Sequence, residues 1–294
     1  MNDEAMDKCL TTVLYGLMRL LGFIPLRLMY VISDFVLYPL IYHVFRYRRR
    51  VVRENLKRCF PEESEAQRRA WERAFYHQFC DNIQESIHQA SITPEELQER
   101  LRFDGYECLY DYLRQGKNVL IYYSHYANWE YQSFFNFAYP GMPMYAVYKP
   151  QKAKFLNDLL VRLRGRFGLV LLPKQRMARA VYEAKSSGQY GLFGLIADQY
   201  AAHDRNCYLM DFFGQPDTHV LNGVERLARH TASVVTYADV RRTGRGHYQT
   251  TLKVITEDPS SLPEREITAR YLRLLEETIR RAPAYWLWTH RRWK

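Results

Sequence analysis

The chain has 294 residues, of which 47% are hydrophobic and 25% are charged, so it can bury a large core in one sizeable domain or two small ones. Lys and Arg outnumber Asp and Glu by 42 to 32, and the resulting net charge of +10 favours anionic partners such as nucleic acid, anionic lipid or phosphorylated substrates. The five cysteines are odd in number and include no CxxC pair, which argues against a disulfide framework and against a zinc site.

Residues 10–45 are the most apolar part of the chain, and no small-residue cleavage site follows them, so they are not a secretory signal. Residues 28–45 barely suffice for one membrane crossing, which needs roughly 20 residues. Asp34 near the middle of that span would cost about 2.5–3.5 kcal/mol in a bilayer. Three readings compete: a transmembrane helix, two helices hinged near Pro25 that lie in the membrane interface, and a pair of buried core helices.

A basic run at residues 46–53 favours contact with a membrane over the core-helix reading. Lys and Arg that follow an apolar segment mark its cytoplasmic side and attract anionic headgroups. A nucleic-acid patch is a weaker interpretation, because the run adjoins an apolar segment and not a groove-reading element. Trp286, Trp288 and Trp293 in the C-terminal tail are additional candidates for interfacial anchors.

The rest of the chain begins with an amphipathic helix over residues 61–92 and a short helix from residue 94, and then alternates strands with helices. Strands are expected at 118–123, 144–148, 168–172, 190–197, 232–241 and 246–256. Helices are expected at 105–115, 128–137, 153–165, 175–187, 220–230 and 263–281. This alternation predicts an α/β fold with a mixed sheet covered by helices. Since no long linker or repeat occurs, we expect one catalytic domain over residues 51–294, preceded by a membrane anchor and basic flank over residues 1–50.

His125 stands where the first strong strand ends, and Glu130 follows five residues later. On one continuous helix these side chains would point about 140° apart. They can meet only if His125 lies in a turn and Glu130 in the first helical turn, with Asn128 as its N-cap. That arrangement would give a histidine base held by a carboxylate. The spacing alone is no evidence, because about one such pair is expected by chance from 9 His and 32 acidic residues.

Other polar groups follow neighbouring strands, where sites form in open α/β sheets. These are Lys149 and the pair Asp198 and Gln199, with Arg164 and Arg166 between them in the sequence. The plain alternatives are a solvated helix face for Arg164 and a turn or cap role for Asp198. The sequence contains no GxSxG elbow, phosphate-binding glycine loop or HExxH motif, so neither a nucleotide, a cofactor nor a metal is expected. What remains is a base that activates a hydroxyl for attack on an already activated acyl group.

The stretch HYANWE, residues 125–130, resembles the H-x-GNWE form of the H-x4-D/E motif of bacterial lipid A late acyltransferases. These are enzymes of the lauroyl/myristoyl transferase type within the lysophospholipid acyltransferase superfamily. The resemblance covers nearly the whole chain. Its other segments, in order, are RYRRRVVRENLKRCFPE, Tyr148-Lys149-Pro150, Arg166-Phe167-Gly168, Ala197-Asp198-Gln199, Phe212-Phe213-Gly214 and WLWTHRRWK. One departure is Ala127, where the family often has Gly.

The resemblance implies a glycerolipid acyltransferase-like fold and transfer of a fatty acyl chain from an acyl carrier protein thioester, or a coenzyme A thioester. The acceptor would be a hydroxyl of a phosphorylated glycolipid, a lipid A precursor, at the cytoplasmic face of the inner membrane, with no nucleic acid involved. His125 would be the general base, and Glu130 would orient it and stabilise the imidazolium. The residues expected to bind substrate are Lys149, Arg164, Arg166, Asp198, Gln199 and Asn128. The alternatives are acyl transfer to another membrane lipid, such as a glycerolipid or aminolipid, and a non-enzymatic membrane- or nucleic-acid-binding protein.

Overall fold

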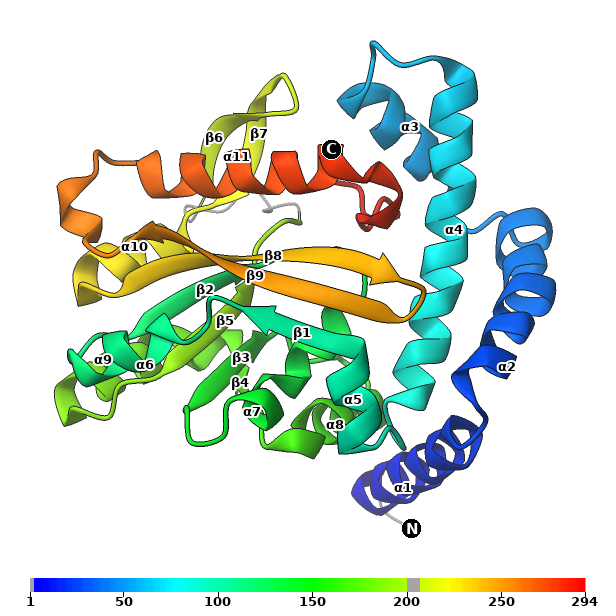
Figure 1. Ribbon diagram of the computed structural model, residues 1–294, viewed down its shortest axis with the longest axis horizontal. Coiled ribbons are helices and arrows are strands. Elements are labelled where there is room, and N and C mark those ends of the chain that lie inside the picture. Colours follow the sequence, from blue (N-terminus) through cyan, green and yellow to red (C-terminus); the bar gives the residue numbers. More distant parts are fainter. Residues whose placement is uncertain (1–2, 200–206, 294) are drawn as a thin grey trace.

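The computed structural model describes residues 3–199 and 207–293 (Figure 1), so the first two residues of the expected anchor and Lys294 of the tail lie outside it. The α-helices are α1 (Asp3–Gly22), α2 (Leu26–Ile32), α3 (Arg49–Cys59), α4 (Glu65–His88), α5 (Pro94–Arg100), α6 (Cys108–Arg114), α7 (Phe135–Ala138), α8 (Lys154–Arg164), α9 (Met177–Ser187), α10 (Gly223–Thr231) and α11 (Glu266–Arg281). The strands are β1 (Leu101–Asp104), β2 (Val119–Tyr123), β3 (Met144–Tyr148), β4 (Val170–Pro173), β5 (Leu192–Ile196), β6 (Cys207–Phe212), β7 (Gln215–Leu221), β8 (Val234–Gly244) and β9 (His247–Thr256).

Seven strands form one sheet in the order β1-β9-β8-β2-β5-β3-β4, and β6 with β7 forms a separate hairpin. Neighbours from β8 to β4 run parallel, whereas β9 is antiparallel to β8. The predicted α/β fold with a mixed sheet is therefore confirmed, and all six expected strands are present. The sequence analysis missed β1 and the hairpin of β6 and β7.

Helices cover both faces of the sheet (Figure 1). Side chains along β2 alternate between two cores: Leu120 and Tyr122 pack with α9, α10 and α11, and Ile121 and Tyr123 pack with α6 and α7. Both faces of β2 are thus buried, which explains why its sequence is a continuous apolar run.

The predicted N-terminal break is confirmed: α1 and α2 are separated near Pro25, and the helical course continues from α2 through π-helical turns to Val44. Within the described residues no single helix is long and apolar enough to cross a membrane, and one helix pair, bent by 104°, passes that test only when its two halves are taken together. Asp34 faces the protein, where its carboxylate accepts from Arg245 at 2.8 and 2.9 Å. The N-terminal helices lie along α4, outside the sheet (Figure 1).

Candidate active site

Strand register brings His125 and Asp198 together. Strands β2 and β5 are parallel neighbours, and Tyr123 at the end of β2 lies opposite Ile196 at the end of β5. His125 and Asp198 each follow two residues later, and His125 Nδ1 lies 2.8 Å from Asp198 Oδ1. The main-chain N–H of His125 donates to Asp198 Oδ2 at 2.9 Å. Since a carboxylate only accepts, Nδ1 of the neutral ring carries the hydrogen and Nε2 carries an unprotonated lone pair, which is the tautomer that a general base needs.

Asp198 is held ionised by its surroundings. Its side chain is buried, with 2% of the residue exposed, and Oδ2 also accepts from Trp286 Nε1 at 2.8 Å. Burial raises the pKa of Asp198, but the His125 ring and the donated hydrogen bonds outweigh this effect, so the pKa lies below its usual value. Asp198 is therefore the carboxylate that orients His125.

The predicted contact between Glu130 and His125 is wrong. Among the hydrogen bonds of the described residues none joins these two side chains, and Glu130 instead accepts from Arg164 at 2.6 and 2.7 Å and from Trp129 at 3.1 Å. Burial raises the pKa of Glu130, but the hydrogen bonds and charge of Arg164 outweigh this effect, so the pKa lies below its usual value. Because a bidentate pair with arginine uses both carboxylate oxygens, Glu130 hydrogen-bonds to Arg164 and not to the imidazole, and it interacts with His125 only through its charge. Arg164 consequently lies in the pocket wall and not on a solvated helix face.

Asn128 builds the turn between His125 and Glu130. Its Oδ1 accepts from the main-chain N–H groups of Glu130 and Tyr131 at 3.0 and 3.3 Å, so the predicted N-cap is confirmed, although the segment Trp129–Phe134 is a 3₁₀-helix. Its Nδ2 donates to the buried Glu85 at 2.6 Å. Both ends of its amide are occupied by protein groups, and Asn128 is not among the residues that line the pocket described below.

The backbone at residue 127 shows how Ala is accommodated where the family motif often has Gly. Its φ is +52°, in the left-handed region where glycine is favoured. The main chain is held there by two hydrogen bonds. The N–H of Ala127 donates to the main-chain carbonyl of Tyr285 at 2.8 Å, and the carbonyl of Ala127 accepts from Asn82 Nδ2 at 2.8 Å. A small residue is tolerated because the neighbouring structure fixes this conformation.

Arg166 lies away from the pocket, contrary to its expected role. Its guanidinium donates to the carbonyls of Gln89 at 3.0 Å and Ile92 at 2.7 Å, just beyond the end of α4. Burial lowers its pKa, which reflects this enclosed position. The side chain therefore ties α4 to the segment after α8 and is not part of the pocket lining.

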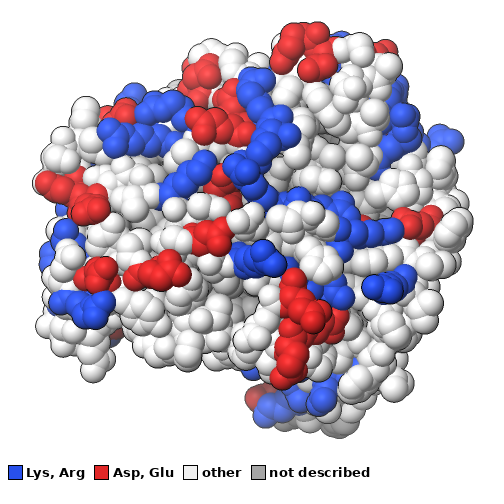
Figure 2. Space-filling model, viewed as in Figure 1, with Lys and Arg blue, Asp and Glu red and all other residues white. Residues whose placement is uncertain are grey.

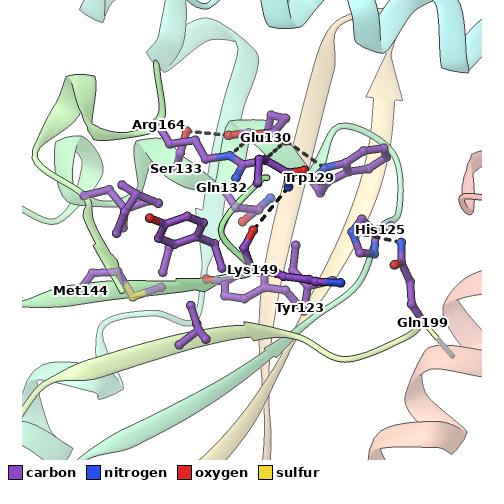
Figure 3. A pocket seen from close by; sticks show the side chains of 18 residues that line it. Tyr123, His125, Trp129, Glu130, Gln132, Ser133, Met144, Lys149, Arg164 and Gln199 are labelled. Carbon is purple, nitrogen blue, oxygen red and sulfur yellow. Dashed lines mark hydrogen bonds and ion pairs between the residues drawn. The ribbon is translucent and has the colours of Figure 1, made fainter. Parts of the chain in front are cut away.

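A pocket of about 380 Å³ opens beside His125 (Figure 3). His125 and Gln199 stand at one end and Met144 at the other, and the Glu130–Arg164 pair lies along the wall between them. Gln199 Nε2 lies 3.4 Å from His125 Nε2. The remaining lining combines the exposed cation of Lys149 with apolar surface. The apolar residues of the lining include Ala146, Val147, Leu169, Leu171, Gly194 and Ile196.

Gly194 keeps the apolar part of the pocket open. A Cβ atom at this position would lie 2.8 Å from Met144 Cε and 2.9 Å from Tyr123 Cε2. Gly194 lies in β5, four residues before Asp198, which corresponds to roughly 13 Å of extended chain at about 3.3 Å per residue. The pocket therefore combines a reactive end with a deep apolar end, and its volume suits a small-molecule or lipid-chain ligand.

Sequence reasoning missed Trp286 as a site residue and offered the tail tryptophans as candidate interfacial anchors. Trp286 and Trp288 are 3% and 0% exposed, so they pack inside the protein and cannot be interfacial anchors. The signal available in the sequence was the resemblance of the tail segment WLWTHRRWK to the corresponding family segment. No group of three or more His, Cys, Asp or Glu within residues 3–199 and 207–293 is placed to hold a metal ion.

Comparison with known proteins identifies the family of the chain. Residues 5–294 match the family model described as bacterial lipid A biosynthesis acyltransferase. The chain belongs to this family. It is 26% identical over 220 residues to a lipid A biosynthesis acyltransferase of Haemophilus influenzae, a match that covers 74% of this chain and 66% of that protein. It is 23% identical over 252 residues to the lipid A biosynthesis palmitoleoyltransferase of Escherichia coli, covering 84% of this chain and 79% of that protein. The predicted family and the predicted class of enzyme, an acyltransferase, are thus confirmed.

Proposed function

We propose that this family member transfers a fatty acyl chain from an acyl thioester, carried by acyl carrier protein or coenzyme A, to a hydroxyl of a lipid A precursor. One observation carries the proposal above the others: the His125–Asp198 dyad stands at the polar end of a pocket whose far end is apolar. A thioester placed there has its carbonyl beside the base and its hydrocarbon chain in the apolar depth.

The chemical step follows from the tautomer of His125. Nε2 takes the proton from the acceptor hydroxyl as its oxygen attacks the thioester carbonyl, and Asp198 stabilises the imidazolium that forms. The carbon–sulfur bond then breaks, and the leaving thiolate recovers the proton from the imidazolium. General base catalysis of this kind supplies about 10²–10⁴-fold, and fixing both reactants in the pocket supplies a further part.

The charges around the site suit a phosphorylated acceptor and an acidic carrier. Lys149 lines the pocket, its side chain is exposed, and it has no ion pair among the described residues. Figure 2 shows further Lys and Arg side chains over α11 and the hairpin end of β8 and β9, interspersed with Asp and Glu side chains. Arg164 is already committed to Glu130, so Lys149 is the cation that we assign to a phosphate of the donor or acceptor.

Residues 1–50 form the membrane-docking part of this proposal, and residues 51–294 form the catalytic domain. Of the 24 large apolar side chains that are exposed among the described residues, 16 lie within the first 47 residues. An exposed apolar surface of this extent, followed by the arginines of residues 46–53, suits a bent helix pair lying in the cytoplasmic leaflet of the inner membrane.

Membrane docking is tested with vesicles that contain anionic lipid. Phe35 and Phe45 are 77% and 72% exposed, and replacing both by Ser should release the protein from co-sedimentation. The matched control replaces Leu209 and Val254, which are 52% and 45% exposed but lie on the catalytic domain. Equal binding by the two double variants would reject the docking surface.

The activity is tested with purified protein, acyl carrier protein and coenzyme A thioesters, and three acceptors offered separately, a tetra-acylated lipid A precursor, a glycerolipid and an aminolipid, with mass spectrometry of the product. Wild-type protein should add one acyl chain, and His125→Ala should add none while its thermal unfolding is unchanged. His247→Ala is the control, because His247 is exposed at the β8–β9 turn and, within the described residues, its ring hydrogen-bonds only to the carbonyl of Arg245. Turnover by His125→Ala at the wild-type rate would refute the assignment of His125 as the general base. Transfer only to a glycerolipid or aminolipid would favour the alternative acceptor.

A further inference from the structure

The tail after α11 returns to the active site and pairs with the loop that carries His125. Leu287 N–H donates to the carbonyl of His125 at 3.0 Å, and Tyr126 forms an antiparallel bridge with Trp286. The main chain of the tail is thus fixed directly against the catalytic loop.

The tail is also held from its other side by α3 and the residue before it. Asn55 Nδ2 donates to the carbonyls of Trp288 at 2.9 Å and His290 at 2.8 Å, and Arg48 donates to the carbonyl of Thr289 at 3.1 Å. These contacts bind main-chain groups, so they set the path of the tail whatever its side chains are. These main-chain contacts therefore fix where the Trp286 ring lies.

Within that path, the Trp286 indole reaches the carboxylate behind His125. Its Nε1 donates to Asp198 Oδ2, the same oxygen that accepts from the His125 main-chain N–H. Two donors on Oδ2 stop the carboxylate from rotating, and Oδ1 is left aimed at His125 Nδ1. A buried N–H bonded to an ionised carboxylate is a strong and directional contact.

We propose that Trp286 is a positioning residue of the acyl transfer reaction, which fixes Asp198 and through it the tautomer and orientation of the His125 ring. The inference rests on the proposed function, because it takes His125 as the general base. Trp286 touches no substrate in this assignment, so its loss should act on kcat and leave KM for both substrates near the wild-type values.

The test compares two tryptophans of the same tail. Trp286→Phe keeps an aromatic ring and removes the N–H, and its kcat should fall about tenfold to a hundredfold, the usual effect of losing a hydrogen bond to a charged group. Trp288→Phe removes an equally buried indole N–H, which donates to the carbonyl of Pro283 at 2.6 Å, and it should leave kcat near the wild-type value. Thermal unfolding of both variants shows whether they are equally folded.

A double-mutant cycle with Asp198→Asn separates positioning from a general loss of structure. If Trp286 acts through Asp198, Trp286→Phe has almost no further effect on kcat once the carboxylate is gone. Independent, multiplying losses would overturn the inference, and so would equal kcat values for Trp286→Phe and Trp288→Phe while His125→Ala is inactive. Full turnover by His125→Ala would instead overturn the proposed function and this inference together.

Discussion

Replacing Asp198 by Asn tests the central pair of the site, because it removes the charge beside His125 and keeps the size of the side chain. The carboxylate oxygen lies 2.8 Å from His125 Nδ1 and is shielded from water. A hydrogen bond to a charged group contributes about 1.5–3 kcal/mol, so kcat should fall at least about 10- to 150-fold. The loss is larger if the amide presents its NH₂ group to the ring, since that selects the wrong tautomer.

The assay is the same acyl transfer reaction with saturating thioester, and two variants accompany Asp198→Asn. Asp239→Asn removes another buried carboxylate, which pairs with Arg281 and Lys253, and it should lower the free energy of unfolding without a comparable fall in kcat. Glu130→Gln should mainly disturb Arg164 and the pocket wall. If Asp198→Asn turns over at the wild-type rate while Glu130→Gln does not, the assignment of Asp198 as the partner of His125 is wrong.

Three further predictions follow from the same structure. Gly194→Val fills the pocket against Met144 and Tyr123, so kcat/KM should shift toward shorter acyl thioesters; an equal loss at every chain length would contradict an acyl chain at this depth. Ala127→Gly removes about 1–2 kcal/mol of left-handed strain and adds about 0.5–1 kcal/mol of chain entropy, so denaturant unfolding should show unchanged or slightly higher stability, and a clear loss would argue against the φ of +52°. Burial lowers the pKa of His290 from its usual 6.5 to about 4, so the unfolded chain takes up this proton at a higher pH than the folded protein. The free energy of unfolding should therefore fall as the pH drops from about 6.5 toward 4. His290→Gln should make this fall shallower, and an unchanged pH dependence would refute the lowered pKa.

The sequence predicted the parallel core of the sheet because its strands are short apolar runs ended by polar residues. It could not predict which carboxylate meets His125. Glu130 is near in sequence, but Asp198 is near in space, because β5 inserts between β2 and β3 although it follows β4 along the chain. Once that strand order is known, the register alone pairs His125 with Asp198. Strand order is a property of long-range packing, and no local pattern carries it.

The missed hairpin and tail have a similar cause. Strands β6 and β7 carry mixed polar and apolar residues, since they stand apart from the main sheet and only part of their surface is buried. The tail tryptophans resembled interfacial anchors because an aromatic and basic segment looks alike in both settings. Only the structure shows that Trp286 and Trp288 point inward and that their N–H groups are used inside the protein.

The N-terminal helices cannot be treated as a detachable anchor, because they share a buried network with the catalytic loop. Glu85 on α4 accepts from Tyr30 of α2 at 2.8 Å, from Tyr248 at 2.8 Å and from Asn128 at 2.6 Å, and burial raises its pKa. Deleting residues 1–45 removes the Tyr30 donor and exposes the carboxyl group of Glu85. Asn128, which also bonds to Glu85, caps the turn that carries Glu130. Such a deletion would disturb the active site as well as membrane binding, so a soluble but inactive product would not separate the two roles. Substitution of the exposed Phe35 and Phe45 leaves that network intact, and it is therefore the cleaner way to ask whether acyl transfer depends on the membrane surface.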